Sequence, residues 1–151
     1  MVNSHAHAPA VALRAFTLGL ALMGRIVELH KALETDKWKG VDGTVLWEPI
    51  IGKRCGLIGM GSIGIYLTKY LEPLTDNFVT LNRYRNRLEN QHNWNYYNTI
   101  KEVCHNSDIT FISLPLTKDT KGIINTEILA NMADKYLVNV GRGELIEEKS
   151  L

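Results

Sequence analysis

The sequence contains little cysteine, little proline and almost no net charge. Its 151 residues include two cysteines and four prolines, and 17 basic side chains nearly balance 16 acidic ones. A net charge near zero provides no field for gripping nucleic acid or an anionic membrane surface, so neither partner is expected. Cys55 and Cys104 lie in apolar segments without the spacing of a metal site or a redox pair. They are therefore predicted to be reduced packing residues, as is typical of a cytoplasmic protein.

Long apolar runs are also missing, although the first 27 residues contain no acid. Segment 15–23 is too short to span a bilayer. No small-residue cleavage site follows a charged leader, which argues against a signal peptide or a presequence. The apolar pattern instead continues to Leu33, and Pro9 suits a first helical turn. One long packed helix from Pro9 to about Leu33 is therefore predicted.

The rest of the chain alternates between strand-like and helix-like segments. Apolar runs predict strands at 55–58, 78–81, 109–114 and 136–140, and helical spacing predicts helices at 63–71, 100–104 and 126–132. Thr126 is a candidate N-cap, and the polar stretch 83–97 is predicted to be a loop. Continuous apolar strands separated by helices indicate a parallel sheet covered on both faces. The predicted fold is therefore α/β, a Rossmann-type doubly wound sheet that is incomplete, with about four strands and a long N-terminal helix.

A glycine pattern falls directly between the first predicted strand and the next helix. Gly59, Gly61 and Gly64 have the offsets of the dinucleotide fingerprint, and Ser62 and Ile63 lie between them. The first glycine permits the tight turn, the second lets a pyrophosphate approach, and the third allows close helix packing. The backbone N–H groups and the helix dipole would point at that pyrophosphate. The alternative is a glycine-rich turn that only packs.

The end of the second predicted strand bears on the choice of dinucleotide. An NAD-binding protein commonly places an acid there, on the ribose 2′-hydroxyl, whereas this chain has Asn82-Arg83-Tyr84-Arg85. Without a carboxylate nothing repels a 2′-phosphate, and Arg83 can bind it through charge-assisted hydrogen bonds. NADP(H) is therefore the preferred cofactor, with NAD(H) as the alternative. Arg85 is as well explained as a solvated loop charge.

Arg142 follows the fourth predicted strand, between two glycines. This places it at the carboxyl edge of the sheet, where doubly wound folds bind ligands. The alternative is a loop arginine paired with a nearby acid. His5 and His7 have no further ligands at metal-site spacing, so no metal site is expected.

These segments resemble the D-isomer-specific 2-hydroxyacid dehydrogenase family, which includes glyoxylate/hydroxypyruvate reductases. The resemblance covers nearly the whole chain. The residues that carry it are Ala8-Pro9-Ala10-Val11-Ala12, Arg25-Ile26, Trp38, Gly52-Lys53, Gly56 to Gly64, Ser107-Asp108, Leu114-Pro115-Leu116-Thr117, Thr120, Ile124-Asn125 and Leu137-Val138-Asn139-Val140-Gly141-Arg142-Gly143-Glu144-Leu145.

The resemblance implies roles for several positions. Arg142 would bind the substrate carboxylate and help to polarise the carbonyl that accepts hydride. The loop with Leu114, Pro115 and Thr120 and the pair Val140-Gly141 would line the cofactor cleft. The implied reaction is hydride transfer between NADP(H) and a small 2-oxo acid.

The resemblance also implies parts that these residues do not include. In the family a substrate domain flanks this unit, and a glutamate and a histidine that carry out acid–base transfer lie beyond the position of Leu151. Residues 1–50 are thus expected to be a helix and loop of the dimerisation type. Residues 51–151 are expected to form the first half of the NAD(P)-binding domain, with the substrate domain absent. Turnover by this chain alone is expected to be negligible.

Three hypotheses follow. The favoured one is a piece of a 2-hydroxyacid dehydrogenase or 2-oxoacid reductase. The second is a nucleotide-binding or dimerisation module, which the long helix would join into a homodimer or to a full-length relative. The third is an inactive relic that folds poorly, because segment 136–140 would be an unpaired apolar edge strand.

Overall fold

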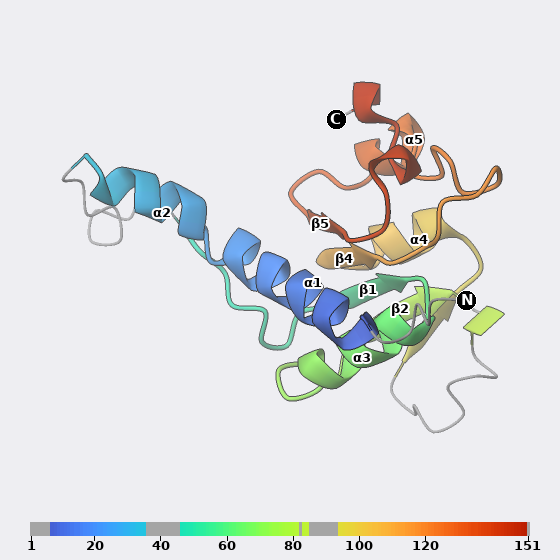
Figure 1. Cartoon of the computed structure of the whole chain (residues 1–151), viewed down its shortest axis with the longest axis horizontal. Helices are drawn as coiled ribbons and strands as arrows, with labels where there is room; N and C mark the ends of the chain where they lie inside the picture. Colours follow the sequence, from blue (N-terminus) through green and yellow to red (C-terminus); the bar gives the residue numbers. More distant parts are fainter. Residues whose placement is uncertain (1–6, 36–45, 82, 85–93, 151) are drawn as a thin grey trace.

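The computed structural model describes residues 7–35, 46–81, 83–84 and 94–150. Predictions that concern His5, Asn82 and Arg85 lie outside these residues. Five parallel strands form one sheet in the order β3-β2-β1-β4-β5, with β3 and β5 at its edges (Figure 1). The strands are β1 (Cys55–Ile58), β2 (Phe78–Leu81), β3 (Asn95–Tyr97), β4 (Ile109–Ile112) and β5 (Tyr136–Asn139). The predicted parallel α/β fold of the Rossmann type is confirmed.

Helices cover both faces of the sheet. Helices α1 (Ala8–Met23) and α3 (Ser62–Leu71) pack on one face, and α4 (Ile100–His105) and α5 (Thr126–Ala130) pack on the other. Helix α2 (Ile26–Leu33) follows α1 and extends away from the sheet (Figure 1). Leu57 and Phe111 face the core that includes α1 and α3, whereas the adjacent Ile58 and Ile112 face the core of α4 and α5. This alternation explains the apolar runs, because each apolar residue of a central strand enters one core or the other.

Helix α1 lies directly on the sheet. A Cβ added to Gly19 would lie 2.9 Å from Cζ of Phe111, so this helix approaches β4 as closely as a residue without a side chain allows. At the start of the helix the Tyr70 hydroxyl of α3 donates to the carbonyl of Pro9 at 3.4 Å. Pro9 occupies the first turn as predicted. The N-terminal segment is therefore part of the same packed unit as the sheet.

The prediction of one continuous helix to Leu33 is wrong. The helix breaks after Met23, and α1 and α2 meet at an angle of 57°. Arg25 has a φ of 53°, in the left-handed region that an α-helix cannot contain. The carbonyl of Met23 accepts the N–H of Glu48 at 3.0 Å, in place of a partner one turn further along the helix. Apolar periodicity continues through the break, and for that reason it did not reveal the bend.

The predicted number of strands and one helix boundary are also corrected. β3 lies inside the stretch predicted to be a loop and pairs with residues 79–81 of β2. It is a three-residue edge strand with a partly exposed side, so it lacks the apolar run that marks a buried strand. The N-cap of α5 is Asn125, whose Oδ1 accepts the N–H of Ile128 at 3.1 Å. Thr126 is instead the first residue of that helix.

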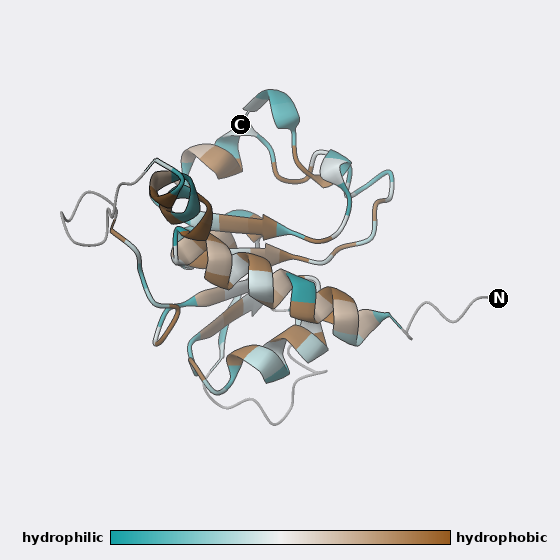
Figure 2. Cartoon of the chain, turned by 60° about the vertical axis from the view of Figure 1, so that its left-hand side comes forward, coloured by the Kyte–Doolittle hydropathy of each residue, from teal (hydrophilic) through white to brown (hydrophobic). Residues whose placement is uncertain are grey.

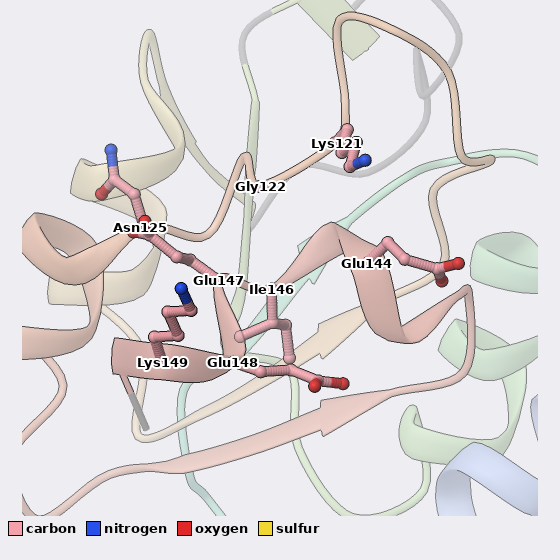
Figure 3. Close-up of a pocket in the computed structure, with 8 residues that line it drawn as sticks. All are labelled: Lys121, Gly122, Asn125, Glu144, Ile146, Glu147, Glu148 and Lys149. Atoms are coloured by element: carbon pink, nitrogen blue, oxygen red, sulfur yellow. The ribbon is translucent and has the colours of Figure 1, made fainter.

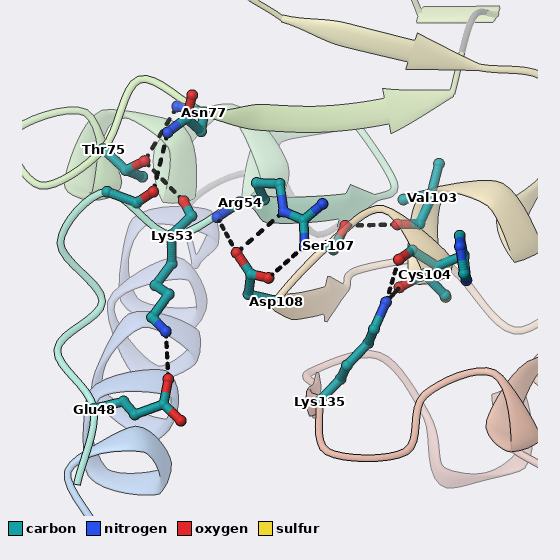
Figure 4. A network of polar contacts seen from close by, with 12 residues as sticks. Glu48, Lys53, Arg54, Thr75, Asn77, Val103, Cys104, Ser107, Asp108 and Lys135 are labelled. Carbon is teal, nitrogen blue, oxygen red and sulfur yellow. Dashed lines mark hydrogen bonds and ion pairs between the residues drawn. The ribbon is translucent and has the colours of Figure 1, made fainter.

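Charged and polar side chains tie together the amino edge of the sheet (Figure 4). Asp108, just before β4, accepts the backbone N–H of Arg54 at 2.8 Å and its guanidinium at 2.7 Å. The hydrogen bonds from Arg54 hold the pKa of the Asp108 carboxyl below its ordinary value. The ammonium of Lys135 donates to the carbonyls of Cys104 and His105 at the end of α4, where a cation suits the helix dipole. These contacts are structural and lie at the edge opposite the glycine turn.

Both cysteines are free and buried, which confirms that they are packing residues. Burial raises the pKa of the Cys55 thiol to about 12 and that of Cys104 to about 11. Neither thiol therefore supplies a thiolate nucleophile near neutral pH.

No single helix among the described residues is both long enough and apolar enough to cross a membrane. The bent pair α1 and α2 meets that test jointly, by length and composition.

The bend at Arg25 predicts that Arg25→Gly stabilises the protein. Glycine adopts a positive φ without the steric cost that a Cβ imposes. Because that relief exceeds the entropic cost of a glycine, we expect a gain of about 0.5–1 kcal/mol in the free energy of unfolding. Urea unfolding followed by circular dichroism measures the change. Arg25→Ala is the matched control, since it also removes the exposed ion pair with Glu28 but keeps a Cβ. Equal stability of the two variants would contradict the explanation.

Candidate functional site

The carboxyl ends of four strands bring most of the predicted site residues to one edge of the sheet. Because β1, β2, β4 and β5 are parallel, the residues that follow them emerge on the same side. The chain crosses from one side of β1 to the other between β3 and β4, so β1 and β4 lie at the topological switch point. The predicted residues at this edge are Gly59, Gly61, Ser62, Ile63, Gly64, Arg83, Leu114, Pro115, Val140, Gly141 and Arg142.

The three glycines of the turn between β1 and α3 have different surroundings. Gly59 has a φ of 108°, and a Cβ there would lie 2.9 Å from the backbone of Ser113. A Cβ on Gly64 would overlap the carbonyl oxygen of Gly59. A Cβ on Gly61 would meet nothing within 4 Å. Two glycines are thus required by the protein's own packing, and the middle one leaves open space in front of the first turn of α3.

That open space suits an anion. The first N–H groups of a helix have no acceptor within the helix, and they carry the positive end of its dipole. Gly61 is the N-cap residue of α3, and its carbonyl accepts the N–H of Ile65 at 3.1 Å. Ile63 packs its side chain against the core of α1 and α3, so at this position the backbone is presented to the open side. The turn fits the pyrophosphate of a dinucleotide.

The loop after β4 forms the other wall of the switch point. Ser113 donates through Oγ to the carbonyl of Gly59 at 2.8 Å, which ties the two loops together. The Thr120 hydroxyl donates to the carbonyl of Pro115 at 2.7 Å and accepts the N–H of Thr117 at 2.8 Å. Thr120 therefore stabilises the conformation of this loop through hydrogen bonds to its backbone. Leu114 is buried among residues of the α4 and α5 core.

The turn after β5 presents Arg142. Asn139 brackets the turn, since its side chain accepts the N–H of Gly141 at 2.9 Å and donates to the carbonyl of Arg142 at 2.8 Å. Gly141 approaches the β4 loop so closely that a Cβ would lie 2.7 Å from the carbonyl oxygen of Leu114. The Arg142 guanidinium is exposed and donates to the carbonyl of Gly141 at 3.2 Å. It forms no ion pair with a carboxylate of the described residues.

The end of β2 carries Arg83, while Asn82 lies outside the described residues. Arg83 is exposed, and its guanidinium carbon lies 5.1 Å from the centre of the Tyr84 ring. It helps to line a hollow of about 310 Å³, together with Leu81, Asn98, Ile100 and Ile123. Its apolar residues, Leu81, Ile100 and Ile123, would accept a flat base, and the cation at its border would accept an anion.

A larger hollow of about 780 Å³ lies elsewhere, beside the segment after β5 (Figure 3). Its walls include Glu144, Glu147 and Glu148, along with Lys121 and Lys149. Three carboxylates would repel the phosphates of a dinucleotide, and none of the glycines of the β1 turn lines this hollow. Its size therefore does not make it the cofactor site.

Some residues that build the site had no role predicted from the sequence. Ser113 and Asn139 hold the two loops and the Arg142 turn in place, and Tyr84 stacks on Arg83. Asn139 directly follows the apolar run of its strand, and a polar residue at that position was a usable signal. Ser113 and Tyr84 act through contacts that only the folded chain brings together.

Comparison with known proteins identifies the family. A family profile described as the D-isomer specific 2-hydroxyacid dehydrogenase, NAD binding domain, matches residues 16–151. The chain belongs to this family of NAD-binding oxidoreductases, as the resemblance implied.

Individual relatives agree with this assignment. A glyoxylate/hydroxypyruvate reductase of Arabidopsis thaliana is 31% identical over 134 residues, covering 87% of this chain and 40% of the relative. A hydroxyphenylpyruvate reductase of Plectranthus scutellarioides is 34% identical over 138 residues, covering 91% and 43%. A solved protein of Pyrococcus horikoshii OT3 superposes with a TM-score of 0.81 at 36% identity, covering 95% and 44%. The chain thus spans less than half the length of each of these relatives.

The different surroundings of the glycines predict different effects of one substitution. Gly61→Ala should leave the melting temperature nearly unchanged and weaken dinucleotide binding about tenfold or more, because the methyl group enters the space of the pyrophosphate. Gly64→Ala should instead destabilise the fold by about 1–3 kcal/mol through overpacking. Thermal melts and a titration with NADPH measure both effects. Equal losses of stability in the two variants would contradict this assignment of the open side.

Proposed function

We propose that this chain forms the cofactor-binding part of a reductase that transfers hydride from a nicotinamide dinucleotide to a small 2-oxo acid. The observation that carries the proposal is that the open glycine turn and Arg142, which forms no ion pair within the described residues, lie at the same sheet edge, on either side of the β4 loop. The names of the relatives support the substrate class, since glyoxylate, hydroxypyruvate and hydroxyphenylpyruvate are all 2-oxo acids.

In this proposal Arg142 binds the substrate. Its guanidinium is a planar, permanently charged fork that matches a carboxylate with two parallel hydrogen bonds. Asn139 fixes the turn from which it projects, so the backbone that carries the fork is ordered before substrate arrives. A bound dinucleotide supplies the hydride. Arg142 orients the acid and draws electron density from the adjacent carbonyl, which favours attack at its carbon.

We further propose that the preferred dinucleotide is NADP(H). Arg83 follows β2. In Rossmann folds, a residue after this strand contacts the ribose of the adenosine. Its charge is exposed and pairs with no carboxylate in the part of the chain that the structure describes. A 2′-phosphate would give this guanidinium a charged partner beside a hollow that accepts the base.

The NADP(H) proposal predicts a selective effect of Arg83→Ala. We expect NADPH affinity to fall about 10- to 100-fold, as for the loss of hydrogen bonds between charged groups, with NADH affinity changed less than threefold. Nucleotide fluorescence or isothermal titration calorimetry measures both constants. Arg14→Ala, which removes an exposed arginine from α1, is the matched control and should leave both unchanged.

Two outcomes would count against these proposals. If the wild-type chain shows no saturable binding of either dinucleotide, the proposed function fails. If Arg83→Ala weakens NADH and NADPH equally, dinucleotide binding stands and the 2′-phosphate assignment fails.

We also propose that α2 joins two copies of this chain. The helix extends from the body of the molecule (Figure 1), and its only buried residue is Ala32. Ile26, Val27 and Leu33 are between 50% and 59% exposed, and Figure 2 colours much of α1 and part of α2 as hydrophobic. An eight-residue helix is not stable alone in water. A second copy would bury these side chains against their own counterparts, as a two-fold dimer requires.

The dimer proposal predicts that Ile26→Asp produces a monomer. A carboxylate buried in an apolar interface without a partner costs several kcal/mol, so sedimentation velocity at micromolar concentration should show the mass fall by half. Lys31→Asp, on the same helix but at a charged position, should leave the dimer intact. A wild-type chain that sediments as a monomer would refute the proposal.

A further inference from the structure

We propose that Tyr84 positions Arg83 for the 2′-phosphate and is thereby a determinant of cofactor choice. This inference rests on the proposed binding of NADP(H). The observation behind it is the stacking of the Arg83 guanidinium over the Tyr84 ring, with 5.1 Å between the guanidinium carbon and the ring centre. A cation over an aromatic face is attracted by the electron density of the ring.

The two side chains differ in how firmly they are held. Tyr84 is partly buried and packs against both hydrophobic cores, the one under α1 and α3 and the one under α4 and α5. Arg83 is exposed and, within the described residues, pairs with no carboxylate. The ring is therefore a fixed surface, and the arginine is a flexible chain resting on it. Among the described contacts, this stacking is what limits the positions that the guanidinium can take.

The ring of Tyr84 holds the Arg83 guanidinium where it could bind the 2′-phosphate. Arg83 lines the hollow between the ends of β2 and β3, where Leu81, Ile100 and Ile123 form apolar walls. An unrestrained arginine loses much of its side-chain entropy when it is immobilised on a ligand. Stacking reduces that loss because the side chain is already confined at the border of the hollow, which is the general benefit of preorganisation.

A purely structural role for Tyr84 would have a different signature. If the ring only filled space, its removal would weaken the fold and would lower the affinity for both dinucleotides alike. A positioning role changes the ratio of NADPH affinity to NADH affinity, because NADH has no 2′-phosphate for Arg83 to bind. The affinity for NADH is therefore an internal control for the fold of the site.

The experiment measures the dissociation constants of NADPH and NADH by calorimetry for the wild type and for Tyr84→Phe, Tyr84→Leu and Tyr84→Met. The phenylalanine keeps a ring face, so the affinity ratio should stay within twofold of wild type. Leucine and methionine fill apolar volume without a ring, and each should lower the ratio about two- to fivefold, as expected for an exposed cation–π contact. Two aliphatic variants are used so that misfolding of one leaves the other to decide.

A double-mutant cycle separates action through Arg83 from any other effect. In the Arg83→Ala background, Tyr84→Leu should leave the ratio unchanged, because the positioned group is gone. The inference is overturned if the aliphatic variants keep the wild-type ratio, if Tyr84→Phe loses it to the same extent, or if Tyr84→Leu still lowers it without Arg83. None of these three outcomes contradicts the proposed preference for NADP(H). That proposal fails separately, if Arg83→Ala does not change the ratio of NADPH affinity to NADH affinity.

Discussion

The close approach of three backbone segments at the switch point is the constraint on which the site depends. Gly59 turns with a positive φ against the backbone of Ser113, and Gly64 seats the first turn of α3 on the carbonyl of Gly59. The Ser113 hydroxyl closes the same contact with a hydrogen bond at 2.8 Å. Any side chain at these positions would push α3 away from β1. The open space at Gly61, and with it the direction of the helix dipole, follows from that packing.

Charged side chains at the two edges of the sheet differ in whether they have partners within the described residues. At the amino edge, Arg54, Asp108 and Lys135 are each satisfied by a carboxylate, a guanidinium or carbonyl groups. At the carboxyl edge, Arg83 and Arg142 point outward without a carboxylate from the described residues. Charges that are satisfied internally hold the fold together, whereas unpaired cations at an edge are available to a ligand. This contrast favours a functional explanation of the two arginines, and burial alone would not have distinguished them.

Much of the fold followed from the sequence because its strongest elements obey local rules. Cys55–Ile58 and Phe78–Leu81 are continuous apolar runs, and each lies in a strand buried on both faces. β3 escaped prediction because an edge strand of three residues needs only one paired side. The break at Arg25 escaped because it depends on Glu48, which binds the carbonyl of Met23 from a distant part of the chain. The glycine turn was predictable from spacing, whereas Ser113 and Tyr84 gain their roles only by tertiary contact.

The path of α1 has a consequence for how the molecule assembles. This helix precedes every strand of the described sheet, yet it packs against α3 and β5, and Gly19 contacts Phe111 of β4. During synthesis α1 is made before the strands it covers, and β5 is made more than a hundred residues later. The same packing means that α1 cannot be removed without uncovering the sheet. A shortened chain that starts at β1 would keep every glycine of the turn and would expose the surface of the sheet that α1 covers.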